Sequence, residues 1–274
     1  MESLERVEKN IKDVKIQGAR EIALYALKFL REFCKKNGFG LKFEVAAMIL
    51  ERARPTAVVL HNCLEIIKKE KKISTINELI KKLENSTKKI SIIGQKIIPE
   101  EAKIMTHCHS GEALSVIKHA NKIGKKISVI ATITEPLHQG IKTVKELAKE
   151  KIPVTLISDN AIGFFIKNVD LVIVGSDAIR KEGFVNKIGT YLLALASKEN
   201  EKPFFVVGNT LKFDKRKKLE IEERPGSEIY KKLKGVKIMN PAFDLVPWKY
   251  VEKIVTEKKI FNPNEIIKIL SKNG

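Results

Sequence analysis

The chain has little cysteine and no long hydrophobic run. Its three cysteines, Cys34, Cys63 and Cys108, are too few and too far apart for a disulfide framework. It contains no Cys-x-x-Cys pair and no His-Glu-x-x-His spacing, which argues against a zinc site. No stretch approaches the roughly 18 apolar residues that a membrane-spanning helix needs. Residues 1–5 are polar and show no apolar signal region, so we expect a cytoplasmic protein.

Acidic residues are also scarce relative to basic ones. The chain has 52 Lys and Arg against 33 Asp and Glu, a net charge of +19. Such an excess is typical of proteins that bind nucleic acid or polyphosphate. However, the lysines are spread along the chain in pairs without interleaved aromatic residues, as on solvated helix faces. We therefore expect neither a nucleic-acid nor a membrane partner, and we expect the positive field to steer phosphorylated substrates.

The first part of the chain has helical periodicity. Apolar residues recur three and four positions apart, as at Ile22, Ala26 and Leu30. This spacing predicts helices at 3–15, 19–36, 42–53, 56–69 and 75–97, with Pro55 as a break. We interpret residues 1–98 as an N-terminal helical domain.

From residue 99 onward, short apolar runs alternate with amphipathic segments. The runs predict strands at 103–105, 127–131, 154–157, 171–174, 204–207 and 236–238. The intervening segments predict helices at 111–123, 140–150, 160–168, 188–198 and 248–256. Alternating strands and helices imply a parallel sheet covered on both faces. The predicted fold class is α/β, with the helical domain followed by a Rossmann-like, doubly wound, mostly parallel sheet domain at residues 99–274.

The sequence Thr-His-Cys-His-Ser-Gly-Glu at residues 106–112 lies where the first predicted strand gives way to a helix. A helix N-terminus carries unsatisfied N–H groups and partial positive charge, which stabilise a thiolate and attract phosphate. This position indicates that Cys108 acts as a nucleophile or base on an anionic substrate. The alternative is an inert buried thiol. Neighbouring residues at a strand end alternate in direction, so His107 and His109 are not expected to bind a metal ion.

Two other predicted strand ends carry polar residues, and ligands of open α/β sheets bind at such ends. Asp177 follows the apolar run at 171–174, where partial desolvation would suit a general acid. Its alternative role is capping the next helix or turn. Asn186 and Lys187 precede a predicted helix and form a candidate phosphate-binding site. Their alternative roles are a helix cap and a solvated lysine.

Spaced motifs extend this pattern. They are Arg-Pro-Thr-Ala-Val at 54–58, Thr-His-Cys-His-Ser at 106–110, Gln-Gly at 139–140, Gly-Ser-Asp-Ala-Ile at 175–179, Asn-Lys-Ile-Gly-Thr at 186–190 and Asn-Pro-Ala-Phe-Asp at 240–244. From about residue 14 onward the chain resembles a superfamily with three kinds of member. These are methylthioribose-1-phosphate isomerases, ribose-1,5-bisphosphate isomerases and regulatory subunits of translation initiation factor 2B.

The resemblance implies a sugar-phosphate aldose–ketose isomerase, most like those that form ribulose 1,5-bisphosphate from ribose 1,5-bisphosphate in AMP and nucleoside salvage. It implies Cys108 as the base at C2 and Asp177 as the acid at the ring oxygen, with the two labels exchangeable. It further implies a phosphorylated pentose substrate, no metal or redox cofactor, an AMP effector and a homo-oligomer, either a dimer or a hexamer. The implied substrate-binding residues are Gln17, Gly18, Ala19, Arg54, Ser110, Gly111, Asn186 and Lys187.

Two segments depart from the family pattern. Arg-Gly-Ala is replaced by Gln-Gly-Ala at 17–19, and Glu-Thr-Arg-Pro by Ile-Thr-Glu-Pro at 133–136. Both changes remove a fork-shaped phosphate donor, so a less phosphorylated substrate is an alternative. One rival prediction is a methylthioribose-1-phosphate isomerase, in which Cys-Asn-Thr-Gly is expected instead of Cys-His-Ser. The other is a non-catalytic initiation factor 2B-like subunit that binds nucleotide or initiation factor 2. The retained Cys108 and Asp177 argue against it.

Overall fold

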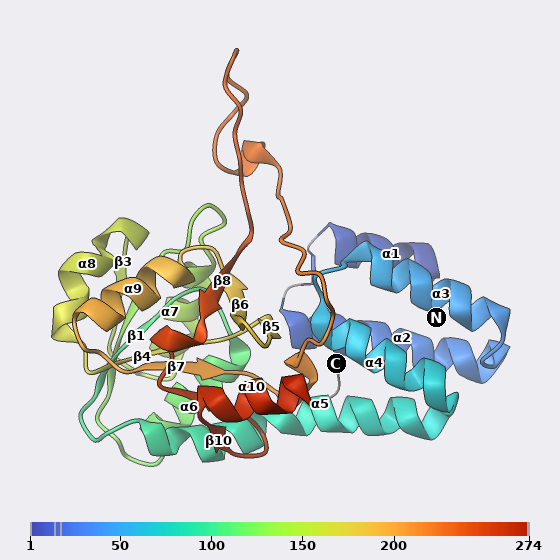
Figure 1. Ribbon diagram of the computed structural model, residues 1–274, viewed down its shortest axis with the longest axis horizontal. Coiled ribbons are helices and arrows are strands. Elements are labelled where there is room, and N and C mark those ends of the chain that lie inside the picture. Colours follow the sequence, from blue (N-terminus) through green and yellow to red (C-terminus); the bar gives the residue numbers. More distant parts are fainter. Residues whose placement is uncertain (1, 14, 17, 273–274) are drawn as a thin grey trace.

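The computed structural model describes residues 2–13, 15–16 and 18–272. Helices α1–α5 form one side of the molecule and a helix-covered sheet forms the other (Figure 1). The helices are Leu4–Lys12 (α1), Ala19–Asn37 (α2), Leu41–Ala53 (α3), Val58–Glu70 (α4) and Ile73–Gly94 (α5). They confirm the five helices that the periodicity predicts.

Helix α2 shows why this part of the sequence is helical. Ile22, Ala26 and Leu30 lie on one face, and all three are buried in a core shared with the other N-terminal helices. The helix ends at Asn37 because Gly38 adopts a left-handed conformation, with φ 70°, and its N–H donates back to the carbonyl of Cys34 at 2.8 Å.

The described residues of the second part form a seven-stranded sheet with the order β10-β9-β7-β4-β1-β2-β3. Its strands are Lys103–Thr106 (β1), Ser128–Thr132 (β2), Val154–Ile157 (β3), Leu171–Val174 (β4), Phe204–Val207 (β7), Lys253–Val255 (β9) and Ile260–Phe261 (β10). All neighbours are parallel except β10, which pairs antiparallel with β9. The α/β class and the mostly parallel sheet are confirmed.

Strand β4 is apolar throughout because both of its faces are covered. Val172 and Val174 pack into one core, beside the helices Ile162–Phe165 (α8), Thr190–Glu199 (α9) and Pro263–Ser271 (α10). Leu171 and Ile173 pack into the opposite core, beside α5 and the helices Gly111–Lys122 (α6) and Gln139–Lys149 (α7). This two-sided burial is the doubly wound arrangement.

Helix α5 joins the two parts of the molecule. At its end, a Cβ on Gly94 would lie 2.6 Å from a methyl carbon of Val116 and 3.0 Å from one of Val255. Only glycine permits this approach of α5 to α6 and to the sheet. The division into domains at residues 98 and 99 stays a prediction.

Three predicted elements differ from the structure. Residues 236–238 form no strand, since they lie in the loop before the strand Phe243–Pro247 (β8), and this loop extends away from both parts (Figure 1). The segment predicted as a helix at 248–256 is a 3-10 turn, Trp248–Tyr250 (η6), followed by β9. The segment at 160–168 is divided into the 3-10 turn Asp159–Ala161 (η2), the short helix α8 and the 3-10 turn Ile166–Asn168 (η3). A short apolar run has no period that separates strand from helix, and tertiary pairing decides.

A second, three-stranded antiparallel sheet was not predicted. Its strands are Ala178–Ile179 (β5), Gly183–Lys187 (β6) and Phe243–Pro247 (β8), in the order β5-β6-β8. Strand β10 and helix α10 were also not predicted from the sequence. Among the described residues, no helix is both long enough and apolar enough to cross a bilayer.

Candidate active site

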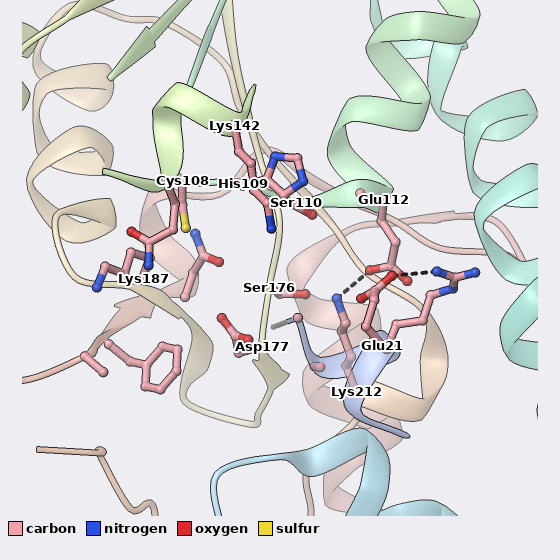
Figure 2. Close-up of a pocket in the computed structure, with 18 of the residues that line it drawn as sticks. Glu21, Cys108, His109, Ser110, Glu112, Lys142, Ser176, Asp177, Lys187 and Lys212 are labelled. Atoms are coloured by element: carbon pink, nitrogen blue, oxygen red, sulfur yellow. Dashed lines mark hydrogen bonds and ion pairs between the residues drawn. The ribbon is translucent and has the colours of Figure 1, made fainter. Parts of the chain in front are cut away.

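A pocket of about 290 Å³ lies where the carboxyl ends of β1 and β4 face the start of α2 (Figure 2). The site residues predicted from the sequence converge here from five separate segments. Those lining the pocket are Gly18, Ala19, Arg54, Cys108, Ser110, Gly111, Asp177, Asn186 and Lys187. The remaining one, Gln17, lies outside the described residues.

Cys108 is held in an unusual backbone conformation between β1 and α6. Its φ is 68°, a left-handed value that is costly for a residue with a side chain. Two threonines fix it there: the Cys108 N–H donates to Oγ1 of Thr134 at 2.9 Å, and its carbonyl accepts from Oγ1 of Thr143 at 2.8 Å. The following helix begins at Gly111, capped by Ser110. These contacts aim the thiol into the pocket (Figure 2).

The electrostatics of Cys108 correct the sequence-based argument. Burial raises the pKa of the Cys108 thiol to about 12, and the charge of Asp177 acts in the same direction. A hydrogen bond from the His109 backbone and the charge of Lys187 oppose this rise but do not outweigh it. The expectation that the helix N-terminus keeps the thiolate near neutral pH is therefore wrong, because desolvation dominates.

Asp177 follows β4 and is partly buried at the pocket. Its N–H donates to the carbonyl of Val185 at 2.7 Å, which ties it to the β5–β6 hairpin. A strand follows it instead of a helix, so the alternative of a helix cap fails. Burial raises the pKa of Asp177, while the charges of Lys212 and Arg54 act to lower it. The carboxyl therefore keeps its proton to a higher pH than an exposed aspartate.

The backbone approach between the two loops depends on Gly175. A Cβ at this position would lie 2.3 Å from Oγ and 2.5 Å from Cβ of Ser110. The loop that carries Asp177 thus packs directly on the loop that carries Cys108.

Asn186 and Lys187 belong to β6, just before α9. The side-chain amide of Asn186 donates to Oγ1 of Thr190 at 3.0 Å. Lys187 is 7% exposed, and no carboxylate in the described part of the chain pairs with it. The alternative of a solvated lysine is wrong, and the burial leaves Lys187 as a free cation that lines the pocket.

Sequence reasoning missed several charged residues that line this pocket or pair with residues that line it. Lys212 forms a buried ion pair with Glu112, and Arg54 Nη2 lies 3.2 Å from a carboxylate oxygen of Glu222. Glu222 also pairs with Arg224 at 3.1 Å. Glu112 stands within the motif at 106–112, but Lys212 and Glu222 come from segments without any motif, so no local signal could have identified them.

Glu135, which replaces an expected arginine, does not line the pocket. Its carboxylate is exposed and lies 2.9 Å from Nε2 of His138. Its backbone N–H donates to Asp159 at 2.7 Å. The charge reversal at this position therefore lies outside the pocket lining.

The two histidines beside Cys108 form hydrogen bonds with different segments of the chain. Nδ1 of His107 lies 2.7 Å from Oγ1 of Thr132, and its Nε2 lies 2.8 Å from the carbonyl of Ile188. Nδ1 of His109 lies 3.1 Å from Oγ1 of Thr143. With their nitrogens engaged in this way, the imidazoles do not converge with Cys108 as a ligand set.

Outside the pocket, Glu51, His61 and Glu65 place three potential ligand atoms within 4.8 Å of one another. Lys68 already supplies a cation to this cluster, with Nζ at 3.3 Å from Glu51 and 2.9 Å from Glu65. The Lys68 ammonium group thus balances the negative charge of Glu51 and Glu65, which a metal ion would otherwise balance.

Known proteins are similar to this chain over nearly its whole length. The family described as the initiation factor 2 subunit family matches residues 15–263. The ribose 1,5-bisphosphate isomerase of Archaeoglobus fulgidus is 41% identical over 93% of this chain and 88% of its own length. That of Methanocaldococcus jannaschii is 38% identical over 99% and 96%. The crystal structure of the Pyrococcus horikoshii translation initiation factor eIF-2B has a TM-score of 0.87 at 30% identity, covering 97% of this chain and 99% of that one.

Proposed function

This chain belongs to the initiation factor 2 subunit family, and on that premise we propose that it is an aldose–ketose isomerase converting ribose 1,5-bisphosphate to ribulose 1,5-bisphosphate. Two relatives named for this activity align with nearly its whole length. The observation that carries the proposal is the convergence of Cys108 and Asp177, two partly buried titratable groups, on one pocket with free cationic side chains (Figure 2).

The reaction needs a base at C2 and an acid at the ring oxygen. The Cys108 thiolate takes the proton from C2, and the electron pair of that C–H bond forms a C1–C2 double bond. The bond from C1 to the ring oxygen breaks, and the ring oxygen takes the proton of Asp177. The Cys108 thiol then returns its proton to C1, while the Asp177 carboxylate accepts the enol proton at O2, which leaves the ketone.

The raised pKa of Asp177 fits its role as the acid in this sequence, whereas Cys108 has to lose its proton against the effect of burial. Asp177 keeps a proton that it can donate, because burial disfavours its charged form. While Asp177 is protonated, it no longer raises the pKa of Cys108, and Lys187 and the His109 backbone promote ionisation of the thiol. Cys108 therefore loses its proton more readily while Asp177 keeps its own proton. The exchanged assignment, with Asp177 as base and Cys108 as acid, uses the same two atoms.

Phosphate would be held by donors that the protein leaves unpaired. Nη1 of Arg54 is buried and has no hydrogen-bond partner among the described residues. Lys187 is unpaired in the same sense, and the backbone at Ser110 and Gly111 forms the N-terminus of α6. Gly18 and Ala19 begin α2 at the opposite wall. No metal ion or redox cofactor takes part in the proposed steps.

We also propose a homo-oligomer, a dimer or a hexamer. Its support is the exposure of large apolar side chains on adjacent helices: Phe164 of α8 is 75% exposed and Leu192 of α9 is 66% exposed. Sedimentation equilibrium measures the assembly. AMP activation and a cytoplasmic location stay predictions from the resemblance and the sequence, and the first is tested by assaying turnover with and without AMP.

The direct experiment is turnover of ribose 1,5-bisphosphate by the wild type, Cys108→Ser and Asp177→Asn. Because positioned acids and bases contribute about 10²- to 10⁴-fold each, both variants should lose at least about 10²-fold in kcat/KM. Cys34→Ser and Asp170→Asn make the same chemical changes outside the pocket and should retain activity. A wild-type protein inactive on ribose 1,5-bisphosphate and on other phosphorylated pentoses would refute the proposal.

A second candidate substrate is methylthioribose 1-phosphate. The observation that favours it is the pairing of Lys212 with Glu112, which leaves fewer free cations for a second phosphate. Parallel assays with the two sugars rank them by kcat/KM. The non-catalytic alternative, a translation-factor subunit, predicts no turnover of either sugar together with co-purification of initiation factor 2.

A further inference from the structure

The cationic side chains of the pocket fall into two groups. The described residues that line it include Arg20, Arg54, Lys142, Lys187, Lys212 and Arg224. Four of them are ion-paired within the protein, namely Arg20, Arg54, Lys212 and Arg224. No carboxylate in the described ranges pairs with Lys142 or Lys187. The positive potential available to a ligand is therefore concentrated on the side of Cys108.

The pair formed by Lys212 and Glu112 differs from the others in its burial. The two side chains are 5% and 4% exposed, whereas Arg20 and its partner Glu21 are 23% and 45% exposed. Water and salt screen an exposed pair but not a buried one. Glu112 therefore neutralises Lys212 far more completely than Glu21 neutralises Arg20.

The Glu112 carboxylate is fixed from two directions. Lys212 binds one oxygen, and the side-chain amide of Asn209 donates to the other at 2.6 Å. The carboxylate therefore cannot rotate away from Lys212 without also losing the hydrogen bond from Asn209. Figure 2 shows this pair on one side of the pocket and Cys108 and Lys187 on the other, with Asp177 between them.

We propose that Glu112 is a specificity-determining residue, an internal anion that competes with the anionic groups of the substrate for Lys212. The proposal deepens the proposed function and rests on it for its kinetic part. A phosphate that enters beside Asp177 meets the Glu112 carboxylate as well as Lys212, so like charges oppose its binding. The Asp177 side thereby favours hydroxyl groups, and phosphate is drawn to the side of Lys142 and Lys187.

The binding test uses inorganic phosphate and does not depend on turnover. Glu112→Gln keeps an oxygen that can accept from Asn209, but it releases Lys212 to bind an anion. We expect isothermal titration to show phosphate binding about tenfold tighter than in the wild type, because a charge-assisted hydrogen bond is gained. Glu51→Gln, which changes a paired carboxylate far from the pocket, should leave phosphate binding unchanged. Unchanged or weaker binding by Glu112→Gln would overturn the proposal.

Loss of one partner of a buried pair can prevent folding, so a second variant is needed. Glu112→Gln combined with Lys212→Met removes both charges together. Because Glu112 keeps Lys212 from binding anions in the wild type, this double variant should bind phosphate within about twofold of the wild type. A tenfold loss would show that Lys212 binds phosphate despite Glu112, and would also overturn the proposal.

The kinetic test compares substrates that differ by one phosphate. Glu112→Gln should lower KM for ribose 1,5-bisphosphate more than for ribose 1-phosphate or methylthioribose 1-phosphate, whereas a purely structural role would alter all three alike. If the wild type turns over none of these sugars, the proposed function fails, and the phosphate titration still decides the role of Glu112. Equal changes in KM for all three sugars would refute the specificity role.

Discussion

Replacing Gly175 by alanine should disturb both halves of the catalytic pair through one contact. The added methyl group would lie 2.3 Å from Oγ and 2.5 Å from Cβ of Ser110, well inside van der Waals contact. One of the two loops must therefore move. Since Ser110 caps α6 and stands two residues after Cys108, while Gly175 stands two residues before Asp177, the movement separates the groups that carry the reaction.

The cost can be worked out from two terms. Forcing an extra methyl group into a packed site typically costs about 1–3 kcal/mol. Displacing Ser110 also weakens its hydrogen bond from the N–H of Ala113, and losing such a cap costs about 1 kcal/mol. Gly175→Ala should therefore lower the free energy of unfolding by about 2–4 kcal/mol. It should also lower kcat/KM by about 10²-fold, the effect of a misplacement of about 1 Å.

A double-mutant cycle isolates the contact. Ser110→Gly removes the two atoms that clash, and glycine costs only a few tenths of a kcal/mol as a cap. The variant with both changes should thus be nearly as stable as Ser110→Gly alone, with a coupling energy of about 2 kcal/mol or more. Urea denaturation gives the stabilities and the isomerase assay gives kcat/KM. Additive effects of the two substitutions would refute the reasoning.

Two further predictions concern the titrating groups. Burial raises the pKa of Asp177 above its usual 3.8, so the folded state binds this proton more tightly than the unfolded state and loses stability as the pH rises through that window. Asp177→Asn should therefore unfold at higher urea concentration than the wild type at pH 7 and lose this advantage at low pH; equal midpoints at pH 7 would contradict it. Alkylation of Cys108 by iodoacetamide should accelerate roughly tenfold per pH unit between pH 7 and 10, because its thiol pKa is about 12. It should be faster in Asp177→Asn at those pH values at which Asp177 of the wild type is ionised, and a plateau below pH 8 would contradict the role of burial.

The parallel sheet and the position of the site were predictable for a local reason. A strand covered on both faces must be apolar throughout, as in Leu171–Val174, and the carboxyl ends of such strands meet at one edge. Cys108 and Asp177 follow neighbouring strands of the sheet, β1 and β4, so this rule alone brings them together.

The features that were missed depend on contacts between distant segments. Strand β6 pairs with β8 across a long excursion of the chain, and a strand of two residues such as Ala178–Ile179 has no readable period. Lys212 meets Glu112 at a separation of 100 residues, without a motif around the lysine. The pKa of Cys108 was misjudged because the field of a helix end is visible in the sequence, whereas the desolvation that outweighs it arises only from packing.

The N-terminal helices and the loop before β8 also meet outside the pocket that holds Cys108, where Oγ1 of Thr56 bonds to Glu222 across 166 residues. A ribosome adds about 5–20 residues per second, so the helical part waits roughly ten to thirty seconds before this partner segment has been made. During that interval the helices can pack, since their core is their own except for Leu211. Arg54, however, has no counter-ion until Glu222 emerges. Catalytic competence is therefore among the last properties that the growing chain acquires, and nascent chains released before β8 would accumulate as folded but inactive helical fragments.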